Sequence, residues 1–491
     1  MRESTTHRSL VFSALLLAMF MAAIEGTIVA TAMPSIAAEL GGFSFYSWVF
    51  SSYLLMQAVS IPIFGKLSDL VGRKPVFILG VAVFLGGSVL CGFARSMGTL
   101  VAFRFLQGLG AGAVQPVTTT LIGDLYPLEE RGRVQGYISG LWGTASIVGP
   151  LAGGLVVHGA GWPWIFWANV PLGLTAIALV TLYLHEGVEP EERSVDYAGA
   201  VMLLAGVGPL MLALTQAGSW GAGAVLPLLA VSAGAFALFV RRERRAPDPL
   251  MHLELWSSPL IRYANLATLG SGVMMIGVIT FLPTYVQGVL GGSALLAGFT
   301  LSAMTLGWPL AAFMAGPRIA RVGVRGMVRG GGVALLLGSL LIALLSARGV
   351  APSGAGSFLL GVGMGLLGTT TVVAIQSSVP WSQRGVTTAS NMLMRILGNA
   401  LGAAFFGGVL NWGMSRYLAR EGLGGRVSLD DIQELMGREG VPHAAPLDAE
   451  VLAQLREGLS GSLHVVFWGI ALLGLVTLLV AWRIPELERS G

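Results

Sequence analysis

Charged residues are scarce in this chain. Of its 491 residues, 11% are charged and 54% are hydrophobic, whereas soluble domains carry about 25% charged residues. So few charges cannot cover the surface of a water-soluble protein of this length. The high apolar content also excludes intrinsic disorder. The single cysteine, Cys91, excludes an internal disulfide framework and a multi-cysteine metal site.

Lysine is rare as well, with only two lysines among the 29 basic residues. The sequence pI is about 9.4, but the basic residues fall in short clusters between long apolar runs, so we expect no nucleic-acid partner. The mean hydropathy of +0.76 indicates an all-α polytopic membrane protein whose surroundings are the lipid bilayer.

Fourteen apolar runs are long enough to predict transmembrane helices, because a helix needs about 20 mostly apolar residues to cross the hydrocarbon core. The runs cover residues 10–34, 46–66, 75–94, 98–122, 134–157, 164–185, 196–215, 222–240, 262–287, 294–316, 327–347, 353–377, 386–413 and 461–482. The remaining long segment, 414–460, is expected to be an external loop.

Arginine and lysine are distributed unevenly between the connections. Most of them fall in the even-numbered connections and at the two ends of the chain, whereas the short odd-numbered connections hold only Arg95 and Arg348. Because basic residues accumulate on the cytoplasmic side, we expect both termini to be cytoplasmic.

Two connections recur at nearly one offset. Gly65-Lys-Leu-Ser-Asp69-Leu-Val-Gly72-Arg73-Lys74 follows the second run, and Gly316-Pro-Arg-Ile-Ala320-Arg-Val-Gly323-Val-Arg325 follows the tenth. Arg131-Gly132 after run four matches Arg384-Gly385 after run twelve. Parallel repeats are typical of transporter architectures. We therefore expect a six-helix bundle in 1–190, two inserted helices in 191–250 and a second six-helix bundle in 251–491.

Four segments carry recognisable motifs. The first is the loop 65–75, quoted above. The other three are Arg104-Phe-Leu-Gln107-Gly108-Leu-Gly110, Gly149-Pro150-Leu-Ala-Gly153-Gly154, and Glu25-Gly-Thr27-Ile-Val-Ala-Thr-Ala-Met-Pro34. Together they resemble the motifs of the major facilitator superfamily and, within it, of the fourteen-span drug:proton antiporters of the EmrB/QacA type. The loop matches that family's G-x-x-x-D-x-x-G-R-[KR], with Leu70 at a position that is usually basic, and Glu25 replaces the usual Asp.

The resemblance implies functions for these motifs. It implies that Asp69, Arg73 and Asp124, around the turn at Gly72, form a conformational gate that separates when the protein opens inward. It implies that the matching arginine, Arg104, takes part in proton transfer. The segment Gly149, Pro150, Gly153 and Gly154 is linked to export rather than uptake; its alternative role is a packing kink.

Glu25 is the only acidic residue deep within a predicted span. An ionised carboxylate at that depth costs at least about 2.5–3.5 kcal/mol, and burial disfavours the charged form of a carboxyl group. Glu25 is therefore predicted to be the proton-coupling residue; the alternative is a permanently protonated side chain that bonds a neighbouring helix. Two arginines also lie within spans. Arg104 needs a carbonyl, water or acidic partner, and Arg395 either faces a central cavity or extends to the cytoplasmic surface.

A substrate surface in such a protein should be apolar with a few polar groups. The candidate substrate-binding residues are Gln57, Gln115, Thr118, Trp142, Tyr285, Trp308, Gln376 and Asn391. No P-loop is present, and the six histidines are scattered without metal-ligand spacing. We expect no enzyme activity, no cofactor and no metal.

The leading hypothesis is a proton-coupled antiporter that exports amphiphilic drugs, with protons and lipophilic small molecules as its partners. We expect a monomeric multi-pass protein of the plasma membrane, in a bacterium the inner membrane. A second hypothesis is dedicated export of one natural product, siderophore or lipid. A third, from another class, is a non-transporting membrane scaffold or a lipid scramblase.

Overall fold

The protein is described by a computed structural model that places residues 6–40, 46–186, 196–216, 221–246, 249, 253–292, 294–422 and 449–486. Every regular element in these ranges is a helix. This follows from the sequence, because apolar segments surrounded by lipid must satisfy their own backbone hydrogen bonds and a helix does so within one segment. Expected membrane helices and observed helices agree over most of the chain.

The described residues of the first bundle form seven helices. They are α1 (Arg8–Leu40), α2 (Tyr46–Val71), α3 (Arg73–Gly92), α4 (Met97–Leu125), α5 (Leu128–Ala160), the short α6 (Pro163–Trp167) and α7 (Asn169–Tyr183). The sixth predicted span is thus divided into α6 and α7. The apolar core of the first bundle includes Val11 and Leu15 of α1, Phe77 and Phe84 of α3, and Val114 of α4.

In the part of the second bundle that the structure describes, there are five long helices. They are α10 (Pro259–Thr284), α11 (Ala294–Leu345), α12 (Val350–Ser377), α13 (Arg384–Arg420) and α15 (Ala449–Trp482). Short helical turns join them: η2 (Leu253–Ser257), η3 (Tyr285–Val289), η4 (Ser346–Arg348) and η5 (Trp381–Gln383). The predicted external segment 414–460 is partly helical, because α13 extends to Arg420 and α15 begins at Ala449. Residues 423–448 of that segment lie outside the described ranges.

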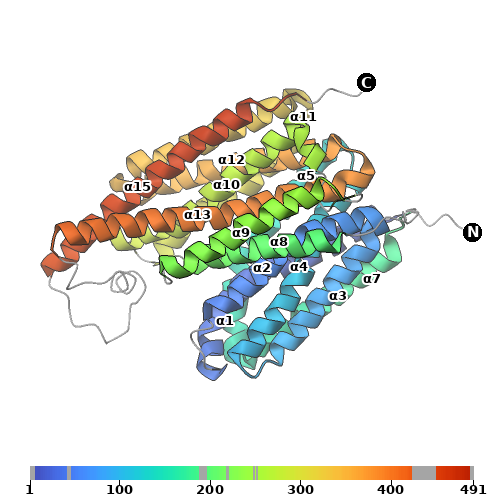
Figure 1. Cartoon of the computed structure of the whole chain (residues 1–491), viewed down its shortest axis with the longest axis horizontal. Helices are drawn as coiled ribbons and strands as arrows, with labels where there is room; N and C mark the ends of the chain where they lie inside the picture. The colour runs from blue at the N-terminus through green and yellow to red at the C-terminus, as the bar shows by residue number, and fades with distance from the viewer. Residues whose placement is uncertain are drawn as a thin grey trace, which may run out of the picture.

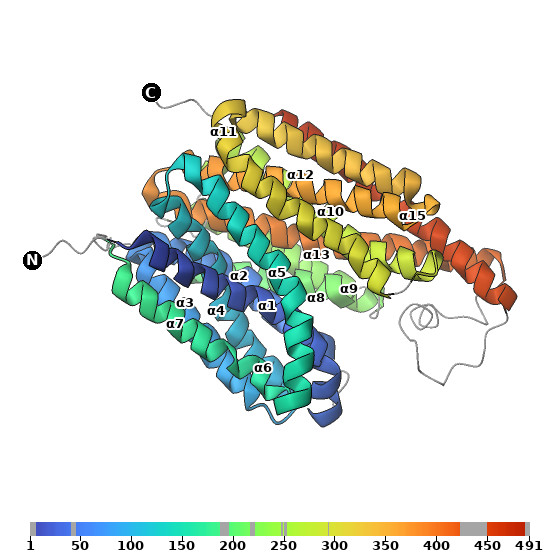
Figure 2. The same cartoon turned by 180° about the vertical axis from the view of Figure 1, so that it is seen from behind.

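The two bundles meet at one end of the molecule and diverge toward the other (Figure 1), and the reverse view agrees (Figure 2). α1 begins and α15 ends on the side where the bundles meet. On one flank α5 packs against α11, with Gly136 against the backbone of Phe313. On the other flank α2 packs against α13, with Gly65 against Ala389.

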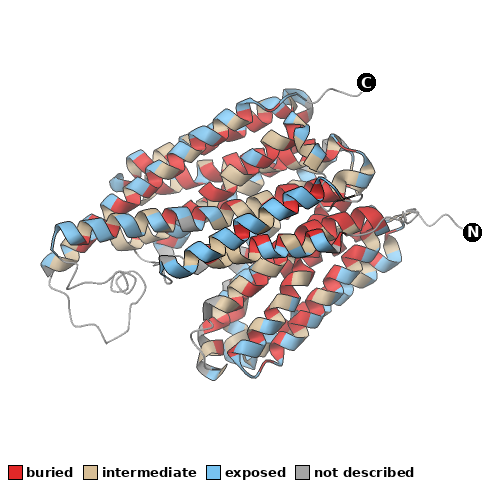
Figure 3. Cartoon of the chain, viewed as in Figure 1, coloured by how far each residue is buried: buried red, intermediate tan, exposed pale blue. Residues whose placement is uncertain are grey.

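The outer surface of the helices is apolar. The exposed residues drawn in pale blue in Figure 3 include Leu226, Val231 and Leu238 of α9 and Leu472 and Leu479 of α15. Such large exposed apolar side chains indicate contact with lipid. In the described ranges, twelve helices are long and apolar enough to cross a membrane, and shorter apolar stretches lie at Leu151–Ala160 and Ala198–Ala213. The structure therefore supports about twelve spans, and the expected fourteen are not confirmed.

The predicted internal repeat has a structural counterpart. Gly72 has φ 95° and ψ 159°, and Gly323 within α11 has φ 80° and ψ 162°. Residues with a side chain rarely adopt this backbone conformation. α11 is thus two helices joined at a kink, in the same way that α2 and α3 are joined at Gly72.

Two further helices, α8 (Tyr197–Gln216) and α9 (Ala222–Glu243), lie between the bundles in the sequence. α8 packs against α2 and α13, so this pair covers one flank of the contact between the bundles. Arg242 of α9 pairs with Asp196 at 2.8 Å. Burial raises the pKa of the Asp196 carboxyl, but hydrogen bonds from Arg242 and from the backbone N–H of Gly199 outweigh it, so the net pKa lies below its usual range.

Candidate functional site

Glu25 and Arg104 form a buried ion pair inside the first bundle. The Nη1 atom of Arg104 lies 2.5 Å from Oε1 of Glu25, and the two side chains are 0% and 1% exposed. Arg104 also donates from Nε to the carbonyl oxygen of Val49 at 3.1 Å, and its guanidinium lies over the ring of Tyr53. Glu25 and Arg104, which the sequence places in separate spans, therefore neutralise each other's charge.

Amide side chains complete this network. Asn169, the first residue of α7, donates to Oε2 of Glu25 at 2.9 Å and to Oγ of Ser88 at 3.0 Å. Gln107, one turn after Arg104, accepts from Arg104 at 2.7 Å and donates to Ser88 at 3.2 Å. The network thus joins α1, α2, α3, α4 and α7. The alternative to proton coupling was a Glu25 side chain that bonds a neighbouring helix. Glu25 does bond neighbouring helices, and one of its partners is the arginine Arg104.

The helix that carries Glu25 packs closely against α5. Thr27 donates to the carbonyl oxygen of Ala145 at 3.2 Å. A side chain at Gly149 would collide with Thr27, and one at Gly153 would press on Ile28 and Thr31 at 3.2 Å.

Gly154 and Pro150, the other two residues of the α5 motif, are not shown to lie in the contact with α1. A side chain at Gly154 would meet nothing within 4 Å, and the side chain of Pro150 lies outside the described part of the structure. Gly149 and Gly153 are therefore the positions at which α1 and α5 require a small residue.

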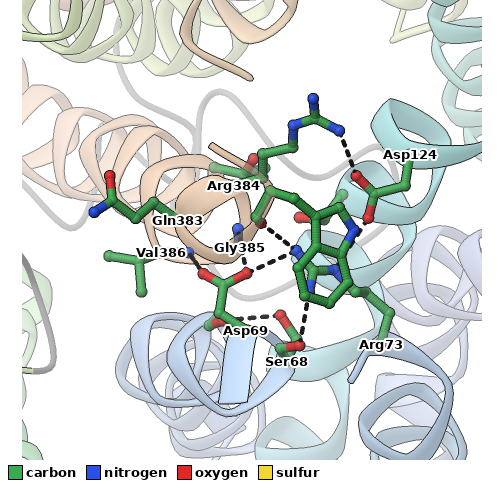
Figure 4. Close-up of polar contacts among 12 residues, drawn as sticks. Ser68, Asp69, Arg73, Asp124, Gln383, Arg384, Gly385 and Val386 are labelled. Atoms are coloured by element: carbon green, nitrogen blue, oxygen red, sulfur yellow. Dashed lines mark hydrogen bonds and ion pairs between the residues drawn. The ribbon is translucent and has the colours of Figure 1, made fainter. Parts of the chain in front are cut away.

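The predicted gate residues meet at the end where the bundles join (Figure 4). Arg73 pairs with Asp69 at 2.9 Å and with Asp124 at 3.0 Å. It also donates to the carbonyl oxygen of Trp381 at 2.7 Å, and its guanidinium lies 3.4 Å from the centre of the Trp381 ring. The sequence predicted the three charged residues, but not Trp381.

Contacts to α13 connect this charge cluster (Asp69, Arg73, Asp124, Arg384 and Trp381) to the second bundle. Asp69 accepts hydrogen bonds from the backbone N–H groups of Gly385 at 2.9 Å and Val386 at 2.8 Å, so its carboxylate lies at the N-terminus of α13, where negative charge is favourable. Arg384 pairs with Asp124 at 2.7 Å.

The repeat relates Arg384 to Arg131, and the structure contains the corresponding contact. Arg131 of the first bundle donates to Oγ of Ser377 at the end of α12, as Arg384 of the second bundle bonds Asp124 at the end of α4. The first contact has a neutral acceptor and the second has a charged one. Arg384 could have been identified from the repeat, since it occupies the position equivalent to Arg131.

The candidate substrate residues of the first bundle are dispersed. Gln57 on α2 and Gln115 on α4 are largely buried, and Thr118 is fully buried with no hydrogen-bond partner for its hydroxyl among the described residues. Trp142 on α5 is 39% exposed.

The four candidates of the second bundle are also dispersed. Gln376 donates to the carbonyl oxygen of Thr119 and to Thr388, so it lies where α4, α12 and α13 meet. Asn391 donates to Asn265 and Thr268 of α10. Tyr285 is buried against His464 and Phe467 of α15, and Trp308 packs on the core of the second bundle. The structure therefore brings Gln115 and Gln376 near the centre, but not Tyr285.

No group of three or more His, Cys, Asp or Glu side chains is arranged to hold a metal ion in the described ranges. Cys91 is buried beside Gln107. The polar assemblies that contain the predicted charged residues are the Glu25 network inside one bundle and the charge cluster between the bundles.

Two helical bundles with a repeated turn, a buried ion pair and a charge cluster at their junction define a membrane-transport fold. Residues 15–403 match the family model described as Major Facilitator Superfamily, and the chain belongs to that superfamily, whose members are transporters rather than enzymes in general. It is a multi-pass membrane protein.

Relatives agree with this family, and a solved structure agrees with the fold. The chain is 33% identical to "Multidrug transporter protein MdtP" of Bacillus subtilis over 82% of this chain and 75% of that protein. It is 32% identical to "Multidrug resistance protein 3" of the same organism over 95% and 92%. The crystal structure of the human organic anion transporter MFSD10 (TETRAN) superposes with a TM-score of 0.66 at 16% identity, covering 97% of this chain and 99% of that one. At that identity the structure supports the fold alone.

Proposed function

We propose that this protein is a proton-coupled antiporter of the plasma membrane that exports amphiphilic small molecules, and that it belongs to the fourteen-span EmrB/QacA type. The observation that carries the proposal is the buried Glu25–Arg104 pair, because an intramembrane carboxylate is costly and is by default functional. The names of the relatives support small-molecule efflux. The two additional spans of the fourteen would be α5 and α8, whose helices are 33 and 20 residues long.

Proton binding to Glu25 would change the charge of the network. With Glu25 ionised, Glu25 and Arg104 are together neutral; with Glu25 protonated, Arg104 is left with a positive charge and with its bonds to Gln107 and Val49. The hydroxyl groups of Ser52 and Tyr53 on α2 have no hydrogen-bond partner among the described residues, so they can accommodate a rearranged carboxyl group. Loading a proton therefore favours a different packing of α1 against α4.

This change can reach the second bundle through direct contacts. Thr27, close to Glu25 on α1, bonds α5, and α5 packs against α11 of the other bundle. In our proposal, the charge cluster holds the two bundles together at one end in this state and separates in the other. A charge cluster with two arrangements is a plausible bistable element.

The orientation follows from the same proposal. If the termini are cytoplasmic, as the arginine distribution predicts, the bundles meet on the cytoplasmic side and the structure faces outward. In that state a substrate leaves and a proton enters, which is the sequence of steps that export by antiport requires. Each proton moved inward contributes about 2.3 kcal/mol per 100 mV of membrane potential.

The proposal is tested with purified protein in proteoliposomes that contain a pH-sensitive dye and carry an imposed pH gradient. We expect several structurally unrelated amphiphiles to accelerate proton movement, each in proportion to its own transport. A response to a single compound class would favour the dedicated exporter. Lipid redistribution without a gradient, and with no proton movement for any compound, would contradict antiport and support the scramblase.

A further inference from the structure

Arg395 of α13 is a charged residue of the membrane interior without a charged partner. It is partly buried. No described residue forms an ion pair or a hydrogen bond with its guanidinium, and no charged side chain in the described ranges acts on it. Arginine cannot lose its charge in a protein, so this positive charge persists, in contrast to Arg104, which Glu25 neutralises.

Arg395 lies well inside α13. It is eleven residues beyond Arg384, the first residue of α13, and at 1.5 Å per residue this is about 16 Å along the helix. If the membrane surface lies at the level of Arg384, Arg395 is near the middle of a hydrocarbon core about 30 Å thick. An extended arginine side chain is shorter than that depth, so this placement favours the central cavity over the cytoplasmic surface, the two alternatives from the sequence.

The face of α13 that carries Arg395 is directed at the centre of the molecule. Thr388, two turns earlier on the same face, bonds Gln376 of α12, which in turn bonds the backbone of Thr119 in α4. The flanks of this face are occupied, since Ala389 packs on α2 and Asn391, one turn before Arg395, bonds α10, whose Gly272 also lies against the carbonyl oxygen of Arg395. Arg395 therefore lies about 10 Å beyond the Thr388–Gln376 contact, on the side where the bundles diverge.

Residue spacing along α12 and α4 places further polar side chains at this level. Thr369 is two turns from Gln376 on the same face of α12; it is 2% exposed, and its hydroxyl has no hydrogen-bond partner among the described residues. Gln115 is one turn from Thr119 on α4 and is 8% exposed. Asn399, one turn beyond Arg395, has a buried carbonyl oxygen without a partner in the described ranges.

The helices around this position carry no negative charge. The sequences of α10, α11, α12 and α13 contain neither Asp nor Glu, and Glu25 is occupied by Arg104. A cationic substrate at the centre would find no free carboxylate there. A substrate with an anionic group would find a guanidinium, which binds carboxylates and phosphates through paired hydrogen bonds.

We propose that Arg395, with Thr369 of α12 and Gln115 of α4, forms a binding site for the anionic group of an amphiphile, a carboxylate or a similar oxyanion. The site rests on the proposed transport function and narrows its substrates to anionic and zwitterionic amphiphiles. The apolar remainder of such a molecule would lie along the apolar surfaces of the diverging bundles.

The test compares three fluorescent probes with one dansyl-undecyl body and different head groups: a carboxylate, a primary carboxamide and a trimethylammonium group. Binding to the purified full-length protein is measured from dansyl emission. We expect the wild-type protein to bind the carboxylate at least about tenfold more tightly than the carboxamide, a factor equivalent to 1.4 kcal/mol, and more tightly than the cation. Equal binding of the carboxylate and the carboxamide would overturn the site.

Variants identify the residue responsible. We expect R395Q to bind the carboxamide as the wild type does and to lose the preference for the carboxylate, and R395K to keep part of it. R416Q is the matched control, because Arg416 is on the same helix, near its other end, where its guanidinium lies over Trp412; it should keep the full preference. A preference that survives in R395Q would refute the assignment.

Transport separates this inference from the proposed function. If the gradient drives transport of the probes but none of them shows a dependence on Arg395, the anion site is wrong and the antiporter stands. If the carboxylate binds with the expected preference but a pH gradient drives none of the three probes, the antiport mechanism is wrong and the binding site stands.

Discussion

Replacing Asp69 by Asn tests whether the charge cluster holds the two bundles together. The carboxylate of Asp69 accepts from Gly385 and Val386 of the second bundle, whereas its bond to Arg73 lies within the first bundle and persists when the bundles separate. Of the bonds that Asp69 forms here, only the two to backbone N–H groups of α13 therefore differ between the joined and the separated arrangement. Asn keeps one acceptor oxygen and loses the charge, so one bond is lost and the other is weakened.

The magnitude follows from these two bonds. A hydrogen bond to a charged group contributes about 1.5–3 kcal/mol, so D69N should disfavour the joined arrangement by about 2–4 kcal/mol. Since 1.4 kcal/mol is a factor of ten, the equilibrium should shift by roughly 30- to 1,000-fold. The shift is large enough to change which arrangement predominates.

The assay is a distance distribution between spin labels on the two bundles. Cysteines replace Arg95, after α3, and Arg348, before α12, both exposed at the ends where the bundles diverge; the native Cys91 is buried. We expect a long distance in the otherwise wild-type protein and a shorter one in D69N. The control is D196N, because Asp196 bonds Arg242 of α9. If D69N leaves the distribution as it is in D196N, the charge cluster does not hold the bundles together.

Further predictions concern the same two assemblies. R384Q removes the ion pair between Arg384 and Asp124, whose side chains are 22% and 13% exposed. Because this pair is more exposed than the contacts of Asp69, the distance between the labels should change in the same direction as in D69N but by less. A larger change than in D69N would contradict this order. G149A should lower the free energy of unfolding by about 1–3 kcal/mol, because a methyl group there collides with Thr27. Thermal unfolding followed by fluorescence checks this against G154A, where the added methyl meets nothing; equal unfolding temperatures would show that α1 and α5 do not need a small residue at this point.

The sequence was sufficient for the elements and for some of the site. Continuous apolar runs predicted the helices, because the membrane leaves the backbone few other options. The two similar loops predicted an internal repeat, and the matching backbone conformations of Gly72 and Gly323 agree with it. Glu25 and Asp69 were identifiable because their charges are unusual at those positions. The count of fourteen spans was not confirmed, because α5 and α8 contain only shorter apolar stretches, Leu151–Ala160 and Ala198–Ala213, among the described residues.

Partners were harder to predict than single residues. Glu25 and Arg104 are 79 residues apart, and Asp69 and Gly385 are 316 apart, so only the packing of the bundles brings them together. The bond from Asn169 to Glu25 depends on where α7 begins, and no charge or motif identifies that residue. Trp381 contributes a ring and a carbonyl oxygen to Arg73, which an aromatic residue in a loop does not reveal by itself.

The proposed antiport depends on Glu25, and it is tested most directly by comparing E25Q with E39Q in proteoliposomes. Both residues lie on α1, but Glu39 is exposed and bonds Trp162 near the end of the helix. We expect E25Q to exchange labelled substrate for unlabelled substrate across the membrane without accumulating it under a pH gradient, because glutamine cannot take up a proton. E39Q should do both. Accumulation by E25Q at the wild-type level would contradict the proposal that Glu25 carries the coupled proton.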